Sequence, residues 1–258
     1  MKRTKVVCTL GPASTSRETV AAMIEAGMDV ARLNFSHGER EEHGAALELV
    51  RDVAAEADRR VAVLQDLAGP KTRIGRIAEG QVVLRAGDAF VLTARDVPGD
   101  EREVSLTYPE LPRDLSAGDR LLLADGTIEL RADEVTDEDI KTTVVVGGPL
   151  SSHKGINLPE RSINAPVLSE KDREDLEDGL GIGVDYVALS FVRRADDIAQ
   201  ARRMIDDAGS PAGLIAKIEK HEAVVDIEAI IDAVDGIMIA RGDLGVEIPV
   251  ETVPREQK

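Results

Sequence analysis

The chain alternates short apolar runs with segments of helical periodicity over most of its length. Residues 5–10 (KVVCTL) are apolar and rich in β-branched side chains, and a Gly-Pro pair ends the run, so this pattern predicts a strand. Val20, Met23 and Ile24 then repeat at helical spacing, which predicts a helix. The same alternation predicts strands at residues 28–33, 61–64, 184–189, 214–218 and 236–240, and helices at 39–57, 195–207 and 221–233.

The first predicted helix carries signals for both of its ends. Thr15 and Glu18 have the spacing of a capping box, in which a hydroxyl is followed three residues later by a carboxylate, so we expect the cap at Thr15. Gly27 is expected to end the helix, because glycine readily adopts the left-handed conformation of a C-terminal cap.

The hydrophobic pattern changes between residues 71 and 165. Short runs of alternating polarity, separated by Gly, Pro and Asp, predict an all-β domain inserted into the surrounding fold. We therefore expect residues 1–70 and 166–258 to form two parts of one α/β domain around this insert. The runs that predict its strands are residues 81–84, 90–93, 120–123, 127–131 and 142–146.

The polar residues distinguish two ways of folding the α/β part. Such strand–helix units form either an open doubly wound sheet, with its site at one switch point, or a (β/α)8 barrel, which takes functional residues from many strand ends. Here charged or hydroxyl side chains follow strand after strand, so we expect an α/β fold of the (β/α)8-barrel type, incomplete in this sequence with about six βα units. These side chains are Arg32, Asn34, Ser36, Asp66, Ser190, Arg193, Lys217, Glu219, Arg241 and Asp243.

The types of residue at these strand ends suit phosphoryl transfer. Glu219 and Asp243 are hard oxygen ligands of the kind that bind Mg²⁺ or Mn²⁺. Arg32 and Arg73 offer planar forks for phosphate or carboxylate, and Lys217 offers a point charge for a transferring group. Taken singly, each of these residues is better explained by a surface salt bridge. Their recurrence at equivalent strand ends favours a shared site.

Composition narrows the class of partner. The 258 residues carry 49 acidic and 32 basic side chains, a net charge of −17, which argues against nucleic acid or an anionic membrane as the main partner. A single cysteine excludes an internal disulfide framework, and no apolar run approaches the roughly 20 residues of a membrane span, so we expect a cytoplasmic protein.

The same charge has a second interpretation. Self-repulsion at −17 disfavours a compact state in dilute buffer, and concentrated salt screens it. We therefore expect adaptation to a saline cytoplasm, that is, a halophilic protein. The alternative is an ordinary acidic protein.

Several segments resemble the pyruvate kinase family. The resemblance covers nearly the whole chain, the β insert included, and its motifs are specific. The segments are residues 6–14 (VVCTLGPAS), 31–38 (ARLNFSHG), 152–159 (SHKGINLP), 190–193 (SFVR), 216–221 (AKIEKH) and 236–249 (GIMIARGDLGVEIP).

The resemblance implies a reaction and a role for each matching residue. The reaction is phosphoryl transfer from phosphoenolpyruvate to ADP, giving pyruvate and ATP in the last step of glycolysis, with the insert acting as a lid that excludes water. By this resemblance the catalytic residues that contact phosphate are Arg32, Arg73 and Lys217, and the ligands of Mg²⁺ or Mn²⁺ are Glu219 and Asp243. The resemblance assigns substrate binding to Ser190, Ala240, Arg241 and Gly242. It assigns nucleotide contacts to Pro12, His37 and Lys154.

One departure from the family concerns its monovalent cation. Asn34, Ser36 and Asp66 match the family's potassium site, but Leu67 stands where most members have Thr, and Lys71 replaces the usual Glu. The resemblance to members that work without potassium implies that the Lys71 ammonium substitutes for the ion, so we expect K⁺ not to be required. The alternative is that Lys71 is a solvated hinge residue.

A second departure concerns length. Family members continue with two further βα units and a C-terminal domain that carries much of the homotetramer contact, and this sequence contains neither. Two hypotheses follow: the chain is the N-terminal part of a pyruvate kinase, or it is a remnant that binds metal and phosphorylated ligand without turnover. An aldolase or lyase of the phosphoenolpyruvate/pyruvate barrel superfamily is a more distant alternative.

Overall fold

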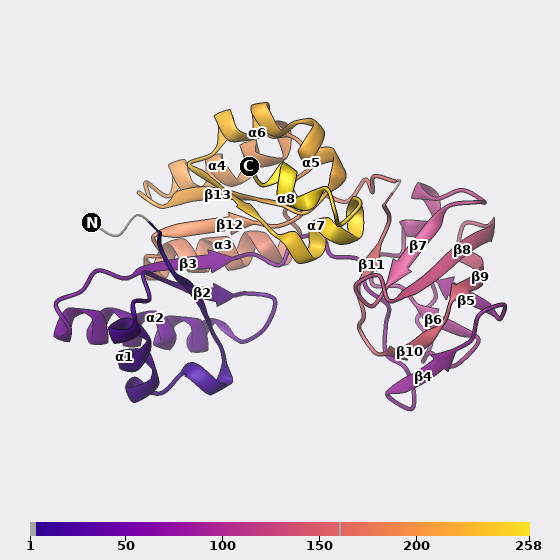
Figure 1. The fold of residues 1–258 in the computed structure, drawn as a ribbon, viewed down its shortest axis with the longest axis horizontal. Helices are drawn as coiled ribbons and strands as arrows, with labels where there is room; N and C mark the ends of the chain where they lie inside the picture. Colours follow the sequence, from indigo (N-terminus) through magenta and orange to yellow (C-terminus); the bar gives the residue numbers. More distant parts are fainter. Residues whose placement is uncertain (1–3, 160) are drawn as a thin grey trace. The chain divides into compact units, whose positions relative to one another are not determined.

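The computed structural model describes residues 4–159 and 161–258 and divides the chain into two compact units (Figure 1). The chain passes from unit 1 to unit 2 between Pro70 and Lys71 and returns between Ala165 and Pro166. Two later segments, which we expected in the α/β domain, belong to unit 2 instead. Unit 1 comprises Met1–Pro70, Pro166–Ile218 and Val225–Met238, and unit 2 comprises Lys71–Ala165, Glu219–Val224 and Ile239–Lys258.

Unit 1 is built on a parallel sheet whose strands follow chain order. Across the described residues the order is β1-β2-β3-β12-β13-β14, with no reversal. Figure 1 labels the four central strands, β2, β3, β12 and β13. A doubly wound sheet would reverse at its switch point, so this order confirms the barrel-type winding. The strands are β1 (Val7–Leu10), β2 (Val30–Asn34), β3 (Ala62–Asp66), β12 (Tyr186–Leu189), β13 (Gly213–Ile218) and β14 (Gly236–Ile239).

The helices of unit 1 lie between these strands in the sequence. Ser16, not Thr15, is the N-cap of the first helix: its side chain accepts a hydrogen bond from the Thr19 amide, so the predicted cap was wrong by one residue. Gly27 ends that helix at a φ of +109°, as predicted. The helices are α1 (Arg17–Ala26), α2 (Arg40–Glu56), α3 (Glu170–Ile182), α4 (Ala199–Asp207) and α6 (Ile227–Ala233), with 3₁₀ turns η1 (Pro12–Ser14) and η3 (Ala195–Ile198).

Alternation along β2 separates the core from the polar face. Ala31 and Leu33 are buried, whereas Arg32 and Asn34 are only partly buried. Because successive side chains of a strand point to opposite faces, Arg32 and Asn34 share the face away from that apolar packing. The strand pattern therefore fixes the side on which the candidate site forms.

The insert in unit 2 has a β core of its own. Its larger sheet has the order β11-β7-β8-β9-β5-β6, β10 pairs with β4, and buried Phe90, Leu92 and Leu121 belong to its hydrophobic core. The strands are β4 (Gln81–Leu84), β5 (Ala89–Thr93), β6 (Glu103–Ser105), β7 (Arg120–Leu123), β8 (Ile128–Val135), β9 (Asp139–Val146), β10 (Gly148–Ser151) and β11 (Ile156–Asn157). Unit 2 also contains η2 (Leu111–Asp114), α7 (Arg241–Glu247) and α8 (Val253–Glu256), while α5 (His221–Val225) lies almost wholly in it.

None of the described helices is both long enough and apolar enough to cross a membrane.

Two glycines of α3 are expected to respond oppositely to the same substitution. A Cβ at Gly179 would lie 2.1 Å from Oε1 of the buried Gln65, whereas a Cβ at Gly181 would have nothing within 4 Å. Gly179→Ala should therefore destabilise unit 1 by about 1–3 kcal/mol through overpacking. Gly181→Ala should stabilise it by about 0.5–1 kcal/mol through helix propensity.

Urea unfolding followed by far-UV circular dichroism measures the change in free energy of unfolding for each variant. The helical signal reports on unit 1, because α1–α4 all lie in it. Shifts of the same sign for the two substitutions would contradict the packing of α3 against β3.

Candidate active site

Five neighbouring strands of unit 1 bring polar side chains together at their carboxyl ends. Asp66, the last residue of β3, is only 1% exposed. The Arg32 Nε donates to Asp66 Oδ2 at 2.6 Å, and its Nη1 donates to Thr9 Oγ1 of β1 at 2.7 Å. Lys217 Nζ, on β13, lies 3.2 Å from Asp66 Oδ1 and donates to Ser190 Oγ at 2.8 Å. The predicted strand-end residues Arg32, Asp66, Ser190 and Lys217 therefore contact one another.

This group of side chains, the Asp66 network, has a surplus of positive charge. One nearly inaccessible carboxylate faces two cations, the Arg32 guanidinium and the Lys217 ammonium, whose side chains are 25% and 12% exposed. A buried carboxylate requires such partners, because desolvation penalises the charged form. The second cation leaves charge available for an anion in a chain that is strongly acidic overall.

Ser190 links Lys217 to the segment that leads into unit 2. The Ser190 hydroxyl donates to the Leu67 carbonyl oxygen at 2.7 Å while its oxygen accepts from Lys217. Leu67 directly follows β3 in the sequence. The position of the Lys217 ammonium is therefore coupled to the backbone at the end of β3.

The residues matched to the potassium site lie around the paired ends of β2 and β3. Asn34 is opposite Asp66 in the strand register, and the Phe35 amide donates to the Asp66 carbonyl oxygen at 2.9 Å. The Ser36 amide donates to Asn34 Oδ1 at 3.2 Å. Asn34 and Ser36 thus lie at the end of β2, and the paired end of β3 places Asp66 beside Asn34.

A histidine positions the loop that contains His37. His43 Nε2 lies 3.0 Å from the His37 carbonyl oxygen, and its ring stacks on Phe35 with centroids 3.9 Å apart. Burial lowers the pKa of His43, against the opposing effect of the His37 carbonyl. The ring is therefore neutral at pH 7 and donates its Nε2 proton to His37. Pro12, the other predicted nucleotide contact in unit 1, begins η1 directly after β1 and Gly11.

In unit 2, Lys71 pairs with one of the predicted metal ligands. Its Nζ lies 3.4 Å from Oδ1 of Asp243, which is in the first turn of α7. The Lys71 side chain also lies against Gly155, where an added Cβ would meet its Cε at 2.8 Å. Ala240 is the N-cap of α7, and Arg241 and Gly242 are its first two residues.

The remaining predicted residues of unit 2 lie on the insert or directly after β13. Arg73 Nη1 donates to the His153 carbonyl oxygen at 3.1 Å, and the Lys154 carbonyl oxygen accepts from Ile74 at 2.9 Å. Arg73 and Lys154 are therefore on neighbouring segments of the insert. Glu219, which follows β13, is 1% exposed.

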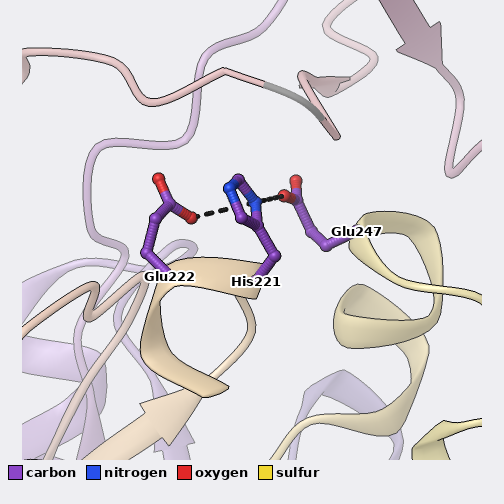
Figure 2. A group of neighbouring side chains, drawn as sticks. All are labelled: His221, Glu222 and Glu247. Atoms are coloured by element: carbon purple, nitrogen blue, oxygen red, sulfur yellow. Dashed lines mark hydrogen bonds and ion pairs between the residues drawn. The ribbon is translucent and has the colours of Figure 1, made fainter. Parts of the chain in front are cut away.

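A cluster near α5 and α7 brings together His221, Glu222 and Glu247 (Figure 2). His221 Nδ1 lies 3.1 Å from Glu222 Oε2 and 3.4 Å from Glu247 Oε2. Their proximity would suit a metal, but Lys220 Nζ already lies 2.8 Å from the same Glu247 oxygen, and Ser162 donates to Glu222. These partners compensate the carboxylates, so the cluster is an ion-pair network.

Thr9 and Glu247 are among the contacting residues that were not predicted from the sequence. Thr9 accepts a hydrogen bond from Arg32. Its hydroxyl, a polar group near the end of an otherwise apolar predicted strand, was the sequence feature that could have indicated this contact. Glu247 is four residues after Asp243 on α7, so its helical spacing was visible, but its approach to His221 depends on the fold.

Comparison with known proteins agrees with the segments that carry the resemblance. A family model described as "Pyruvate kinase, barrel domain" matches residues 1–258. Curated pyruvate kinases of Mycobacterium intracellulare and Thermococcus litoralis are 50% and 46% identical to this chain over 257 and 256 residues. A third, from Geobacillus stearothermophilus, is 45% identical over 260 residues. These matches cover 99–100% of this chain, which spans 54% of the first two relatives and 44% of the third.

Proposed function

This chain belongs to the pyruvate kinase barrel-domain family, and from that premise we propose that it carries the N-terminal part of an enzyme that transfers a phosphoryl group from phosphoenolpyruvate to ADP. The observation that carries the proposal is the Asp66 network, in which Arg32 and Lys217 converge at the carboxyl ends of parallel strands. Functional residues of barrels are taken from those ends.

The proposed roles follow from the charge of each group. Lys217, fixed by Ser190 and Asp66, supplies a point charge to the phosphoryl group as negative charge develops on its oxygens. Arg32 keeps its Nε and Nη2 on Asp66 and its Nη1 on Thr9, and each Nη has a second N–H that it can offer to phosphate. We assign Arg73 a second phosphate contact, and Ser190, Ala240, Arg241 and Gly242 to substrate binding, by family resemblance.

Glu219 and Asp243 are the residues that would hold a divalent cation. Two carboxylates form the small hard-oxygen set that Mg²⁺ or Mn²⁺ accepts. The Lys71 ammonium lies 3.4 Å from Asp243 Oδ1, a contact loose enough to leave this carboxylate able to bind an ion, so the donor set fits. Such an ion would neutralise charge on the phosphate oxygens when bound. The residues of this chain orient the phosphate and supply fixed positive charge.

Turnover is expected not to depend on potassium. Lys71 already supplies an ammonium to unit 2, at Asp243, and Asp66 is neutralised within unit 1 by Arg32 and Lys217. Replacing KCl with a tetramethylammonium salt at equal ionic strength should leave the rate of ATP formation unchanged. Loss of activity that KCl restores would show instead that Asn34, Ser36 and Asp66 require the ion.

The insert is assigned the role of a lid, with Lys154 on the insert and Pro12 and His37 on unit 1 as nucleotide contacts. Closure of a lid excludes water, which strengthens the electrostatic interactions and prevents hydrolysis. We place this reaction in the cytoplasm, where glycolytic substrates are found.

We also propose adaptation to a saline cytoplasm, based on the net charge of −17. Raising KCl from about 0.1 to 1 M reduces the Debye length from roughly 10 to 3 Å, which should screen the self-repulsion. The urea midpoint should therefore rise with KCl over this range. An unchanged or falling midpoint would identify an ordinary acidic protein.

A coupled assay of ATP formation, run beside Mn²⁺ binding, tests the proposed function. ATP formation that requires phosphoenolpyruvate, ADP and the divalent ion supports an enzyme. Mn²⁺ binding without turnover under any condition would leave only the non-catalytic remnant.

A further inference from the structure

Asp172 is a buried carboxylate in the first turn of α3, within unit 1. It is 0% exposed, yet none of its recorded partners among the described residues is a cation. Its Oδ2 accepts from the Ser169 amide at 3.0 Å and from the Ser169 hydroxyl at 2.5 Å. Its Oδ1 accepts from the Gly69 amide at 3.0 Å. Capping of α3 involves only Oδ2, which binds Ser169. The bond from Gly69 to Oδ1 is therefore not part of the helix cap.

The two partners of Asp172 flank both connections to the insert. Gly69 comes just before the chain leaves unit 1 at Pro70, and Ser169 comes just after the chain returns to it at Pro166. These connections are far apart in the sequence. One carboxylate therefore joins the outgoing and the returning backbone on the unit 1 side.

The outgoing connection also packs closely against the Asp66 network. Gly69 has a φ of +68°, and a Cβ there would lie 2.9 Å from both Ser190 Cβ and Phe191 Cδ2. Ser190 in turn donates to Leu67 and accepts from Lys217. Displacement of Gly69 toward Ser190 would therefore press on the residue that holds the Lys217 ammonium.

We propose that Asp172 is a positioning residue that clamps the two connections together, so that the insert moves about a fixed point while the 67–69 backbone stays packed on Ser190. The clamp itself follows from the geometry of unit 1. Its consequence for phosphoryl transfer rests on the function proposed above. Burying a carboxylate is costly, and its two bound backbone amides provide the compensation.

Hydrogen exchange at the Gly69 amide tests the clamp directly. Asp172→Ala should accelerate that exchange by at least about tenfold, since a bond to a charged acceptor is lost. Ser169→Ala removes a capping partner but leaves the bond to Gly69, so it is the matched control and should change Gly69 exchange little. The Ala62 amide at the start of β3, bonded to the Asp29 carbonyl oxygen and outside the clamped segment, reports any global loosening.

If the Asp172→Ala protein fails to fold, amide exchange is measured in Asp172→Asn instead. Its side-chain amide must face one of the two backbone donors, at Gly69 or Ser169, so exchange should accelerate at one of these amides. Unchanged exchange at both amides in this variant would overturn the clamp, as would equal Gly69 exchange in the Asp172→Ala and Ser169→Ala proteins.

A second measurement concerns the insert. Spin labels at the exposed positions 48 on α2 and 137 on the insert, in a Cys8→Ser background, report the spread of distances between the two units. Asp172→Ala should broaden this distribution, whereas Ser169→Ala should not. Equal widths in the two variants would overturn the proposal. Neither measurement requires turnover, so failure of the clamp and failure of the proposed reaction are separate results.

Discussion

Replacing Lys217 with Met is expected to lower ATP formation about 10²–10³-fold, the usual cost of removing one preorganised charge from a transition state. The Lys217 side chain is 12% exposed and is fixed by Ser190 and Asp66. Arg32, the other cation of the network, is itself held by Asp66 and Thr9, so it would have to rearrange to replace the lost charge. The methionine preserves most of the length of the side chain and removes only its charge. Asp66 keeps its bonds to Arg32, so the fold should survive.

A matched control separates this effect from a general loss of positive charge. Lys171→Met removes an exposed ammonium on α3 that pairs with Asp175, four residues further along the same helix. Its rate of ATP formation should be that of the parent protein. Similar rates for the two variants would show that the Lys217 ammonium has no part in the reaction.

Replacing Asp66 with Ala is expected to destabilise unit 1 by about 3–5 kcal/mol, because it leaves two cations close together without their shared carboxylate. The guanidinium of Arg32 and the ammonium of Lys217 both contact Asp66, which is 1% exposed. The same change should also abolish ATP formation, since neither cation would keep its position. Urea unfolding followed at 222 nm measures the stability loss.

An exposed ion pair provides the comparison. Lys141 and Glu134 lie 3.0 Å apart on the insert with more than half of each side chain exposed, so Glu134→Ala should cost at most about 1 kcal/mol. Combining Asp66→Ala with Lys217→Met should recover part of the loss, because it removes one of the unpaired cations. A cost for Asp66→Ala no greater than that of Glu134→Ala would contradict the buried network.

The strand-end residues could be predicted because two local rules agree there. Arg32 follows the buried Ala31 and precedes the buried Leu33, so alternation alone assigns it to the face opposite the core. Parallel strands then place their carboxyl ends at one edge, which brings Arg32, Asp66 and Lys217 together.

Other features depended on contacts that no local pattern contains. The helix predicted over residues 221–233 is divided into α5 and α6 at Asp226, whose carboxylate accepts from the Ala195 amide at 2.9 Å. The predicted helix over residues 195–207 begins instead with the 3₁₀ turn η3. Strands β6, β10 and β11 were not predicted. β6 and β11 are too short for alternation to appear, and β10 begins with Gly148 and Pro149, which are typical of a turn.

The clusters around Asp172 and Glu247 show the same limit more sharply. Asp172 contacts Gly69, which is 103 positions away, and Glu247 contacts His221, which is 26 positions away. Sequence spacing contained no information about these partners. Only the packing of the fold brings them into contact.

If the Asp66 network binds the phosphate of the substrate, calorimetric titration with phosphoenolpyruvate in the presence of Mn²⁺ should detect that contact. We expect saturable binding by the parent protein and by Lys171→Met, weakened at least about tenfold in Lys217→Met, consistent with loss of a charge-assisted contact. Equal affinities in all three proteins would contradict this expectation.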